Sequence, residues 1–509
     1  MHRTTLILFF LMLTLAPALA QKKLKLKHAD KLVGGKIGDE RVEKLKGNVI
    51  FVQNTTTIYC DSAYFFKKRN SLEAFGSVRI TDGDSVTITA RKLEYDGNIK
   101  RAKLRNNVVF KKLHQATLYT DFLDYDRPIN QASYFNGGRL VDSINVLTSR
   151  KGYYDVNSNM ASFKKNVEVK NPDYTMQSDS LQYNSKTKII FFRTTTKVIK
   201  TDSSTSVYES GTYDTRTKRS DLRTATAENT EYKIVARSFD LDAFRKIYKG
   251  RGDVIMTSKK ENMIIYGQSS DAYQERGITK IYDRAYAAKV SDDGDTLFLR
   301  ADTLVAIDNK DPKKRRVLAY NNVRIFKKDL QGIADSLEYR SADSTLFFYK
   351  KPVLWTQGNQ MTADSISMLI RNGTIDKIFM VANCFVISKD TLVNFNQIKG
   401  RKMTAEFSNQ KIRRVVVQGN GESIYYALDD KDNSFIGMNK IICSNITIRF
   451  NEGKVSNLSF YVRPEASFFP PHELKDEDKT LQGFNWQEKQ RPAKKDVIPL
   501  NLSSSSPKK

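Results

Sequence analysis

Apolar and polar residues alternate along most of this chain, in short runs separated by polar turns. Val49 with Phe51 and Leu181 with Tyr183 are typical runs. Alternation with a period of two predicts β-strands that bury one face. Dipeptides such as Asp82-Gly83 fit the tight turns of hairpins. Patterns of helical period are scarce, so the sequence predicts an all-β protein.

Two short motifs recur in a fixed order. The first is Gly or Asn followed by Val, any residue and an apolar residue; the second is a small residue, Asp, Ser or Thr, and an apolar residue. The period is about 30 residues, which gives about 13 units. A unit of this size cannot bury its apolar face alone, so stacked units predict an elongated antiparallel structure with a continuous interior. The first motif occurs at residues 47–51, 76–80, 107–110, 166–169, 253–256 and 322–326, and the second at 60–64, 178–183, 301–304, 334–339 and 363–366.

The ends of the chain differ from the repeats. Residues 1–20 have a basic start, an apolar run and a small-residue ending, which predicts a signal peptide cleaved after Ala20; an uncleaved anchor is the alternative. Residues 21–29 form a basic N-terminal segment and residues 30–462 the repeat region. Residues 463–509, with Pro, Ser and Lys, are expected to form a tail with one docking turn, at residues 468–469 or 484–486. Towards Arg401 and Asn439 the period lengthens to about 37 and 38 residues, which indicates insertions.

The composition argues against several kinds of chemistry. Three widely spaced cysteines do not make a disulfide framework; we expect small buried hydrophobes, with one pair as the alternative. Four histidines show no zinc-site spacing, so we expect neither a metal nor a cofactor. No catalytic constellation stands out. The net charge of +27 fits acidic partners such as lipid phosphates, and the export signal disfavours nucleic acid.

The repeated Gly-Asn-Val and Ala-Asp-Ser-Leu motifs behind a signal peptide resemble the OstA-like family, over roughly residues 30–462. The family includes the periplasmic bridge protein of lipopolysaccharide transport. The resemblance implies an elongated β-jellyroll or solenoid, either one array or two or more stacked jellyrolls, with an open V-shaped groove for the acyl chains of lipid A. It implies a non-catalytic periplasmic carrier, possible association with the inner face of the outer membrane, and partners among inner- and outer-membrane transport components with OstA-like domains. Open sheet ends would also permit head-to-tail self-association.

The candidates for the lipid-binding groove are the inward apolar positions of the repeats. Each has a closed core as its alternative role, because an open groove and a closed core share the same alternation. The candidates are Val49, Phe51, Val78, Ile80, Leu93, Tyr95, Val108, Phe110, Leu123, Tyr125, Val167, Val169, Leu181, Tyr183, Val323, Ile325, Leu337 and Tyr339.

Two other functions compete with lipid carriage. A structural or adhesive secreted protein would need only a dry core. A polysaccharide-active β-solenoid enzyme would use paired carboxylates such as Asp179 and Asp335. An Asp that recurs once per unit, however, favours a turn or capping role over a place in a single active site.

Overall fold

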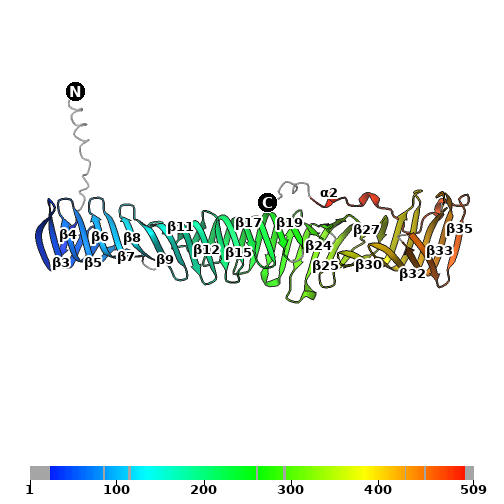
Figure 1. Ribbon diagram of the computed structural model, residues 1–509, viewed down its shortest axis with the longest axis horizontal. Helices are drawn as coiled ribbons and strands as arrows, with labels where there is room; N and C mark the ends of the chain where they lie inside the picture. Colours follow the sequence, from blue (N-terminus) through cyan, green and yellow to red (C-terminus); the bar gives the residue numbers. More distant parts are fainter. Residues whose placement is uncertain are drawn as a thin grey trace, which may run out of the picture. The chain divides into compact units, whose positions relative to one another are not determined.

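The computed structural model describes residues 23–83, 86–112, 116–259, 262–290, 294–429, 431–451 and 454–498. The signal peptide predicted for residues 1–20 lies outside these residues. The chain divides into two compact units, an N-terminal unit up to Arg216 and a C-terminal unit from Thr217 (Figure 1). Both are built almost entirely of antiparallel strands, which confirms the predicted fold class. No helix among the described residues is long and apolar enough to cross a membrane.

The N-terminal unit is a meander in which most long strands pair with the strand before and the strand after. The basic segment predicted for residues 21–29 contains the first strand, Lys25–His28, which pairs with the strand Glu40–Gln53. The strands are β1 (Lys25–His28), β2 (Lys31–Ile37), β3 (Glu40–Gln53), β4 (Thr56–Phe66), β5 (Ser71–Asp82), β6 (Val86–Asp96), β7 (Arg101–Lys112), β8 (Ala116–Asp126), β9 (Gln131–Val141), β10 (Val146–Asp155), β11 (Met160–Asn171), β12 (Tyr174–Asn184), β13 (Ile189–Phe192), β14 (Thr196–Lys200) and β15 (Thr205–Asp214).

The C-terminal unit continues the meander pattern, but several of its strands are split into two pieces and the last ones are longer. Its strands are β16 (Arg219–Glu228), β17 (Tyr232–Asp242), β18 (Ile247–Ser258), β19 (Met263–Tyr273), β20 (Ile278–Tyr282), β21 (Tyr286–Val290), β22 (Thr296–Arg300), β23 (Thr303–Ile307), β24 (Arg316–Lys327), β25 (Leu330–Arg340), β26 (Thr345–Tyr349), β27 (Val353–Thr356), β28 (Asn359–Thr362), β29 (Ser365–Arg371), β30 (Thr374–Lys389), β31 (Phe395–Ser408), β32 (Lys411–Leu428), β33 (Phe435–Asn451), β34 (Lys454–Tyr461) and β35 (Glu465–Phe469). The short helical turns are η2 (Gln274–Arg276), η3 (Pro312–Lys314), η4 (Asp476–Asp478), η5 (Glu488–Gln490) and α2 (Lys494–Val497).

The first sequence motif marks a bulge in the middle of a long strand. In β3 the register shifts between Lys46 and Val49, and the two intervening residues, Gly47 and Asn48, have φ angles of 77° and 46°. Gly and Asn adopt this left-handed backbone at the lowest cost, which explains why the motif begins with them. A Cβ on Gly47 would lie 2.2 Å from the Asp30 carboxylate, so the site has no room for a side chain.

The Asp of the second motif caps the bulge of a neighbouring strand. The Asp61 carboxylate accepts a hydrogen bond from the Ser77 backbone N–H at 2.7 Å. Asp121 does the same for the Asn107 N–H at 3.0 Å. At these two positions the Asp satisfies a backbone donor freed by the bulge, which confirms the predicted capping role there. Asp302 and Asp364 instead accept a hydrogen bond from the side-chain amide of an Asn, Asn322 and Asn383 respectively.

The bulges divide each unit into two walls whose inner faces pack together. In the N-terminal unit Phe51 lies on one wall and Phe65 on the other, with ring centroids 5.0 Å apart. Leu45 is 1% exposed and Val49 is completely buried between the walls. Each long strand passes from one wall to the other at its bulge, so the walls are joined along the bulges. The opposite edges of the walls carry the turns between strands, and we call the line where these edges face each other the mouth.

Residues 470–498 form a strap across the outer face of one wall of the C-terminal unit (Figure 1). Two buried glutamines hold its backbone. The Gln397 side chain donates to the Lys479 carbonyl and accepts from the Leu481 N–H, both at 2.8 Å. The Gln360 side chain makes the same pair of bonds, at 2.7 Å each, to the backbone of residues 485 and 487.

Apolar contacts add to the binding of the strap. The Phe395 ring lies 5.4 Å from the Phe484 ring and 5.3 Å from the Trp486 ring. Leu481 is 4% exposed and Val497 is fully buried. The expected tail with one docking turn is therefore attached from residue 470 to residue 498, because outward-facing residues of the repeat strands supply both the glutamines and an apolar surface.

Candidate functional site

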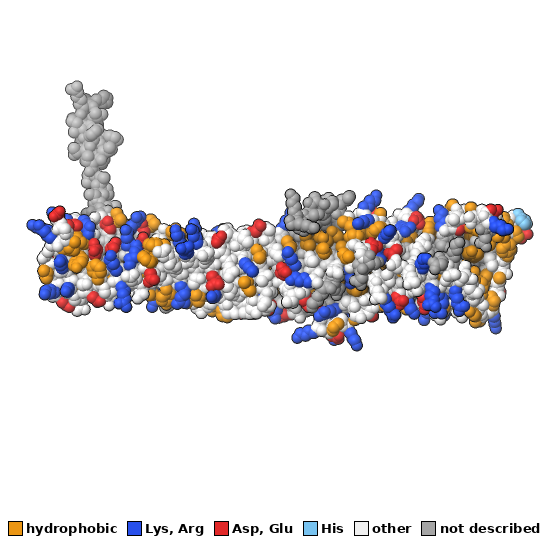
Figure 2. Space-filling model, in the orientation of Figure 1, with side chains coloured by type: hydrophobic (Ala, Val, Ile, Leu, Met, Phe, Trp, Pro, Cys, Tyr) orange, Lys and Arg blue, Asp and Glu red, His pale blue; other side chains and the backbone are white. Residues whose placement is uncertain are grey.

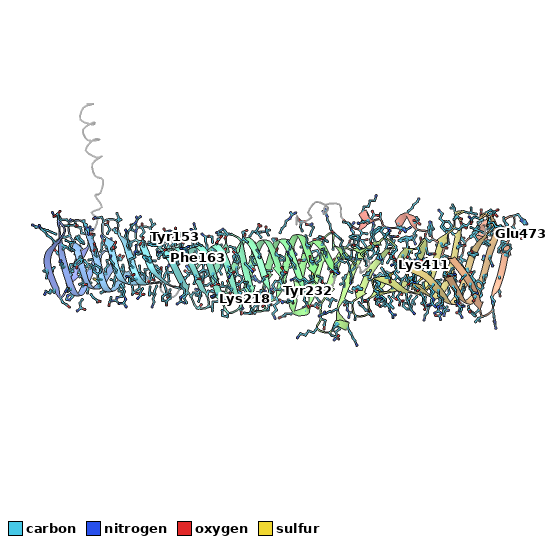
Figure 3. The ribbon with its side chains drawn as sticks, in the orientation of Figure 1. Tyr153, Phe163, Lys218, Tyr232, Lys411 and Glu473 are labelled. Carbon is cyan, nitrogen blue, oxygen red and sulfur yellow. The ribbon has the colours of Figure 1, made fainter. Side chains whose placement is uncertain are left out.

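The predicted groove residues lie on the inner faces of the walls. Every one except Tyr339 is at most 5% exposed, and Tyr339 is half-buried. They do not form one site: the residues from Val49 to Tyr183 lie in the N-terminal unit, and those from Val323 to Tyr339 lie in the C-terminal unit. Two residues labelled in Figure 3 lie on neighbouring strands of the N-terminal unit: Phe163 in β11 is 1% exposed and Tyr153 in β10 is 41% exposed.

A row of polar contacts crosses the mouth of the N-terminal unit; we call it the seam. Its first member is Gln53, at the turn between β3 and β4. The Gln53 side chain accepts a hydrogen bond from the Tyr95 hydroxyl at 2.6 Å and donates to the Gly97 carbonyl at 2.8 Å. Tyr95 and Gly97 belong to the opposite wall and its turn, so these bonds join the two walls.

The second member of the seam is Asp82, which is 8% exposed. Its carboxylate accepts hydrogen bonds from the Arg127 guanidinium, the shortest at 2.9 Å, and from the Tyr125 hydroxyl at 3.2 Å. Burial disfavours the charged carboxylate and by itself would raise the pKa of Asp82. The hydrogen bonds from Arg127, Thr55 and Thr56, together with the positive charge of Arg127, outweigh burial and lower this pKa. The carboxylate is therefore ionised at neutral pH and binds the opposite wall.

Lys112 and Asp142 continue the seam, and with Gln53 and Asp82 they recur about every 30 residues, one per repeat. The Lys112 ammonium donates to Asn159 and to the carbonyl of residue 156. Asp142 accepts from the Tyr183 hydroxyl and, at 3.3 Å, from the Lys188 ammonium. The open mouth that the resemblance implies is therefore not present along this part of the N-terminal unit, because the seam joins the two walls.

The C-terminal unit contains an apolar cavity of about 200 Å³ between its two walls, near its last strands. Met, Ile, Val and Phe side chains dominate the lining, and several of them remain partly exposed to the cavity, unlike the inner residues of the N-terminal unit. One wall supplies Met380, Met403, Phe407, Ile412, Val415, Ile446, Ile448, Phe450, Val455, Leu458 and Phe460, and the other supplies Met361, Val386, Ile398, Ile424 and Ile441.

The rim of this cavity is polar but uncharged. Asn359, Ser388, Asn396, Tyr425 and Asn439 line it on one wall. Such groups can form hydrogen bonds to hydroxyl, ester or amide groups of an amphiphile while its hydrocarbon lies inside. The arrangement suits binding of an apolar chain and offers no group placed for catalysis.

Contacts also cross the mouth of the C-terminal unit, but none of those described here is an ion pair. The Gln357 side chain donates to the Gln410 carbonyl at one end of the cavity. Further along, the Tyr232 hydroxyl, labelled in Figure 3, donates to the Asp308 carboxylate at 3.0 Å. The Lys289 ammonium donates to the Tyr339 hydroxyl at 3.3 Å, which is a third contact between the two walls.

Sequence reasoning missed the cavity residues, because the motifs fade towards the end of the chain. One signal was available: the longer spacing near Arg401 and Asn439 corresponds to the long strands β30, β32 and β33. The Lys and Arg side chains behind the net charge of +27 do not gather in one patch on the face drawn in Figure 2. On the face in Figure 2, Lys and Arg side chains are spread along both units with Asp and Glu among them.

Groups suited to metal or thiol chemistry are not arranged for it in the part of the chain that the structure describes. There, no three His, Cys, Asp or Glu side chains are placed to hold a metal ion. All three cysteines are buried free thiols. Burial, aided by the charge of Asp61, raises the pKa of the Cys60 thiol to about 12.

These features define a protein built of bulged β-repeats that enclose an apolar interior between two walls. The family model of OstA-like proteins matches residues 21–179 of the chain. Among solved structures, the chain is similar to LptH, the LptA-homologous periplasmic component of the lipopolysaccharide transport device from Pseudomonas aeruginosa. That match has 15% identity, covers 23% of this chain and 79% of LptH, and has a TM-score of 0.20. No curated protein matches the chain significantly.

Proposed function

We propose that this protein is a non-catalytic component of a periplasmic lipopolysaccharide-transport bridge, which binds the acyl chains of the lipid and carries it towards the outer membrane. The observation that carries the proposal is the apolar cavity between two walls of antiparallel strands in the C-terminal unit, with hydrogen-bonding side chains along one wall. The match of residues 21–179 to the family model of OstA-like proteins supports a place in this transport system.

The cavity is large enough to hold part of an acyl chain. A cavity of about 150 Å³ can hold benzene, so about 200 Å³ accommodates a short run of CH₂ groups. Burial contributes about 0.8 kcal/mol per CH₂, so five groups contribute about 4 kcal/mol before the cost of ordering the chain. This affinity is moderate, which suits a carrier that must release its cargo.

The remaining interactions concern partners and charge. The net charge of +27 favours anionic partners, including lipid phosphates, through an attraction that weakens as salt rises. The end strand β34, with Leu458 39% and Tyr461 49% exposed, is a candidate edge for strand pairing with OstA-like domains of other transport components or with a second copy.

Photo-crosslinking in cells tests the proposal. A benzophenone-bearing residue replaces Phe450, which lines the cavity, and in a separate variant it replaces Arg449, the exposed neighbour on the same strand. We expect lipopolysaccharide adducts at position 450 and none at 449. A folded, exported protein without adducts at position 450 would contradict lipid carriage by this cavity.

A further inference from the structure

The lipid-accessible part of the interior can be located more closely by comparing the two units. We propose that the seam excludes acyl chains from the N-terminal unit, so that the lipid is bound by the C-terminal unit alone. The residues that determine this are Asp82 with Arg127 and Asp142 with Lys188. The inference rests on the proposed function and adds to it which part of the chain takes the ligand.

The packing of the N-terminal interior leaves little space for a ligand. Phe110 is 2% exposed and contacts the Tyr125 and Tyr154 rings, with centroids 6.2 Å and 5.7 Å away. Tyr125 donates its hydroxyl to Asp82, and Tyr154 lies within hydrogen-bond distance, 3.0 Å, of Ser185. Tyr125 therefore both fills the interior and joins the two walls through Asp82.

Ion pairs strengthen the seam at two places. The Asp82 side chain is 6% exposed and its partner Arg127 is 32% exposed. The Asp142 side chain is fully buried, and its partner Lys188 is 21% exposed. An acyl chain entering from the side would have to separate these pairs and leave the buried carboxylates beside hydrocarbon, which is strongly unfavourable.

The C-terminal unit has the opposite character. Its cavity is lined by residues such as Val386, Ile398 and Phe450, which stay partly exposed, and no charged side chain contributes to the lining. Hydrocarbon can enter there without separating an ion pair of the lining. The two units therefore differ in access, although both have apolar inner faces.

Photo-crosslinking of the full-length protein tests the inference. The probe replaces Phe110, beneath the seam, or Lys111, its exposed neighbour, and the probe at Phe450 serves as the reference. We expect adducts at position 450 and none above background at 110 or 111. Adducts at both 110 and 450 would overturn the inference and leave the proposed function standing. No adduct at either would refute the proposed function, and the inference with it.

Seam variants test the cause of the exclusion. With the probe at position 110, Asp82→Ala combined with Asp142→Ala is expected to raise lipid adducts several-fold over the unmodified seam. Arg127→Gln combined with Lys188→Gln removes the more exposed member of each ion pair. This variant replaces the first one in the experiment if the first does not fold. Glu94→Ala, which removes an ion pair with Lys92 on exposed side chains of the same unit, is the control and should leave position 110 free of adducts. A folded seam variant without adducts would show that the seam is not what excludes lipid.

Discussion

Replacing Asp82 by Ala is the most direct perturbation of the seam. The change removes the acceptor of the Arg127 guanidinium, the Tyr125 hydroxyl and the Thr55 and Thr56 hydroxyls. Tyr125 is 3% exposed, so its hydroxyl would lose its closest partner away from water. We expect the N-terminal unit to lose stability and its mouth to open locally.

The size of the stability loss depends on how exposed Arg127 and Tyr125 are once the Asp82 carboxylate is removed. Removing one member of a fully buried ion pair costs about 3–5 kcal/mol. Arg127 is 32% exposed and regains water when its partner is lost, which reduces that cost. The stranded Tyr125 hydroxyl adds about 1 kcal/mol. We therefore expect Asp82→Ala to cost about 2–4 kcal/mol.

The effect depends on pH in a defined direction. The pKa of Asp82 is lower in the folded protein than the value of about 3.9 in an unfolded chain. A depressed pKa means that the folded state binds fewer protons, so the contribution is present above about pH 4 and is lost as pH falls through the folded pKa. The difference between wild type and Asp82→Ala should therefore be constant near neutral pH and shrink below about pH 4.

Hydrogen exchange measures this loss where it occurs. With two compact units, a single unfolding midpoint does not report on one of them, whereas exchange of amides in β4 to β8 does. A loss of about 2–4 kcal/mol corresponds to roughly 30- to 800-fold faster exchange from these strands. The control Glu94→Ala, on an exposed pair, should cost less than about 1 kcal/mol. Equal exchange in Asp82→Ala and wild type would refute the seam as a stabilising contact.

Three further changes probe the core, the strap and a thiol. Phe51→Ala, at a fully buried ring, should lower the stability of the N-terminal unit by about 3–5 kcal/mol, measured by hydrogen exchange of amides in β3 to β5. A loss no larger than that of Val52→Ala, at a half-buried neighbour, would contradict a packed interior. Gln397→Ala removes both side-chain bonds from this residue to the strap and should speed proteolytic cleavage within residues 470–498. The control Gln418→Ala, at an exposed site, should leave the cleavage rate unchanged. Equal cleavage rates in the two variants would show that the Gln397 bonds do not hold the strap. Burial and a neighbouring carboxylate raise the pKa of the Cys60 thiol to about 12, so alkylation at pH 8 should require unfolding, and rapid labelling of the native protein would count against its burial.

The repeats could be predicted from the sequence because two constraints act locally. A left-handed bulge needs Gly or Asn, as at Asn107, and its freed backbone donor needs a nearby acceptor, as at Asp121. These constraints leave a mark in many of the units, so the period and the inner face could be predicted. Val49 and Leu181 are buried as predicted, and whether such residues contact lipid stays a prediction.

The seam and the cavity could not be predicted, because they depend on residues brought together across the mouth. Asp82 and Arg127 are 45 residues apart, about one and a half repeats, and no local pattern relates them. Gln360 and Gln397 read as ordinary polar positions of strands, and only the path of residues 470–498 gives them a function. The alternation distinguishes inner from outer residues, but the closure of the mouth depends on partners far along the chain.

The length of the strands differs between the N-terminal unit and the part of the C-terminal unit where lipid is expected to bind. In the N-terminal unit β4 has 11 residues, and the walls are short enough for Gln53 to reach Tyr95. In the C-terminal unit β32 has 18 residues. Seven more residues lengthen a strand by about 23 Å, at about 3.3 Å each. Longer walls leave more depth between bulge and mouth, and the inner side chains of this end do not fill it completely. Insertion into a repeat therefore turns a closed core into a cavity without changing the motifs that define the fold.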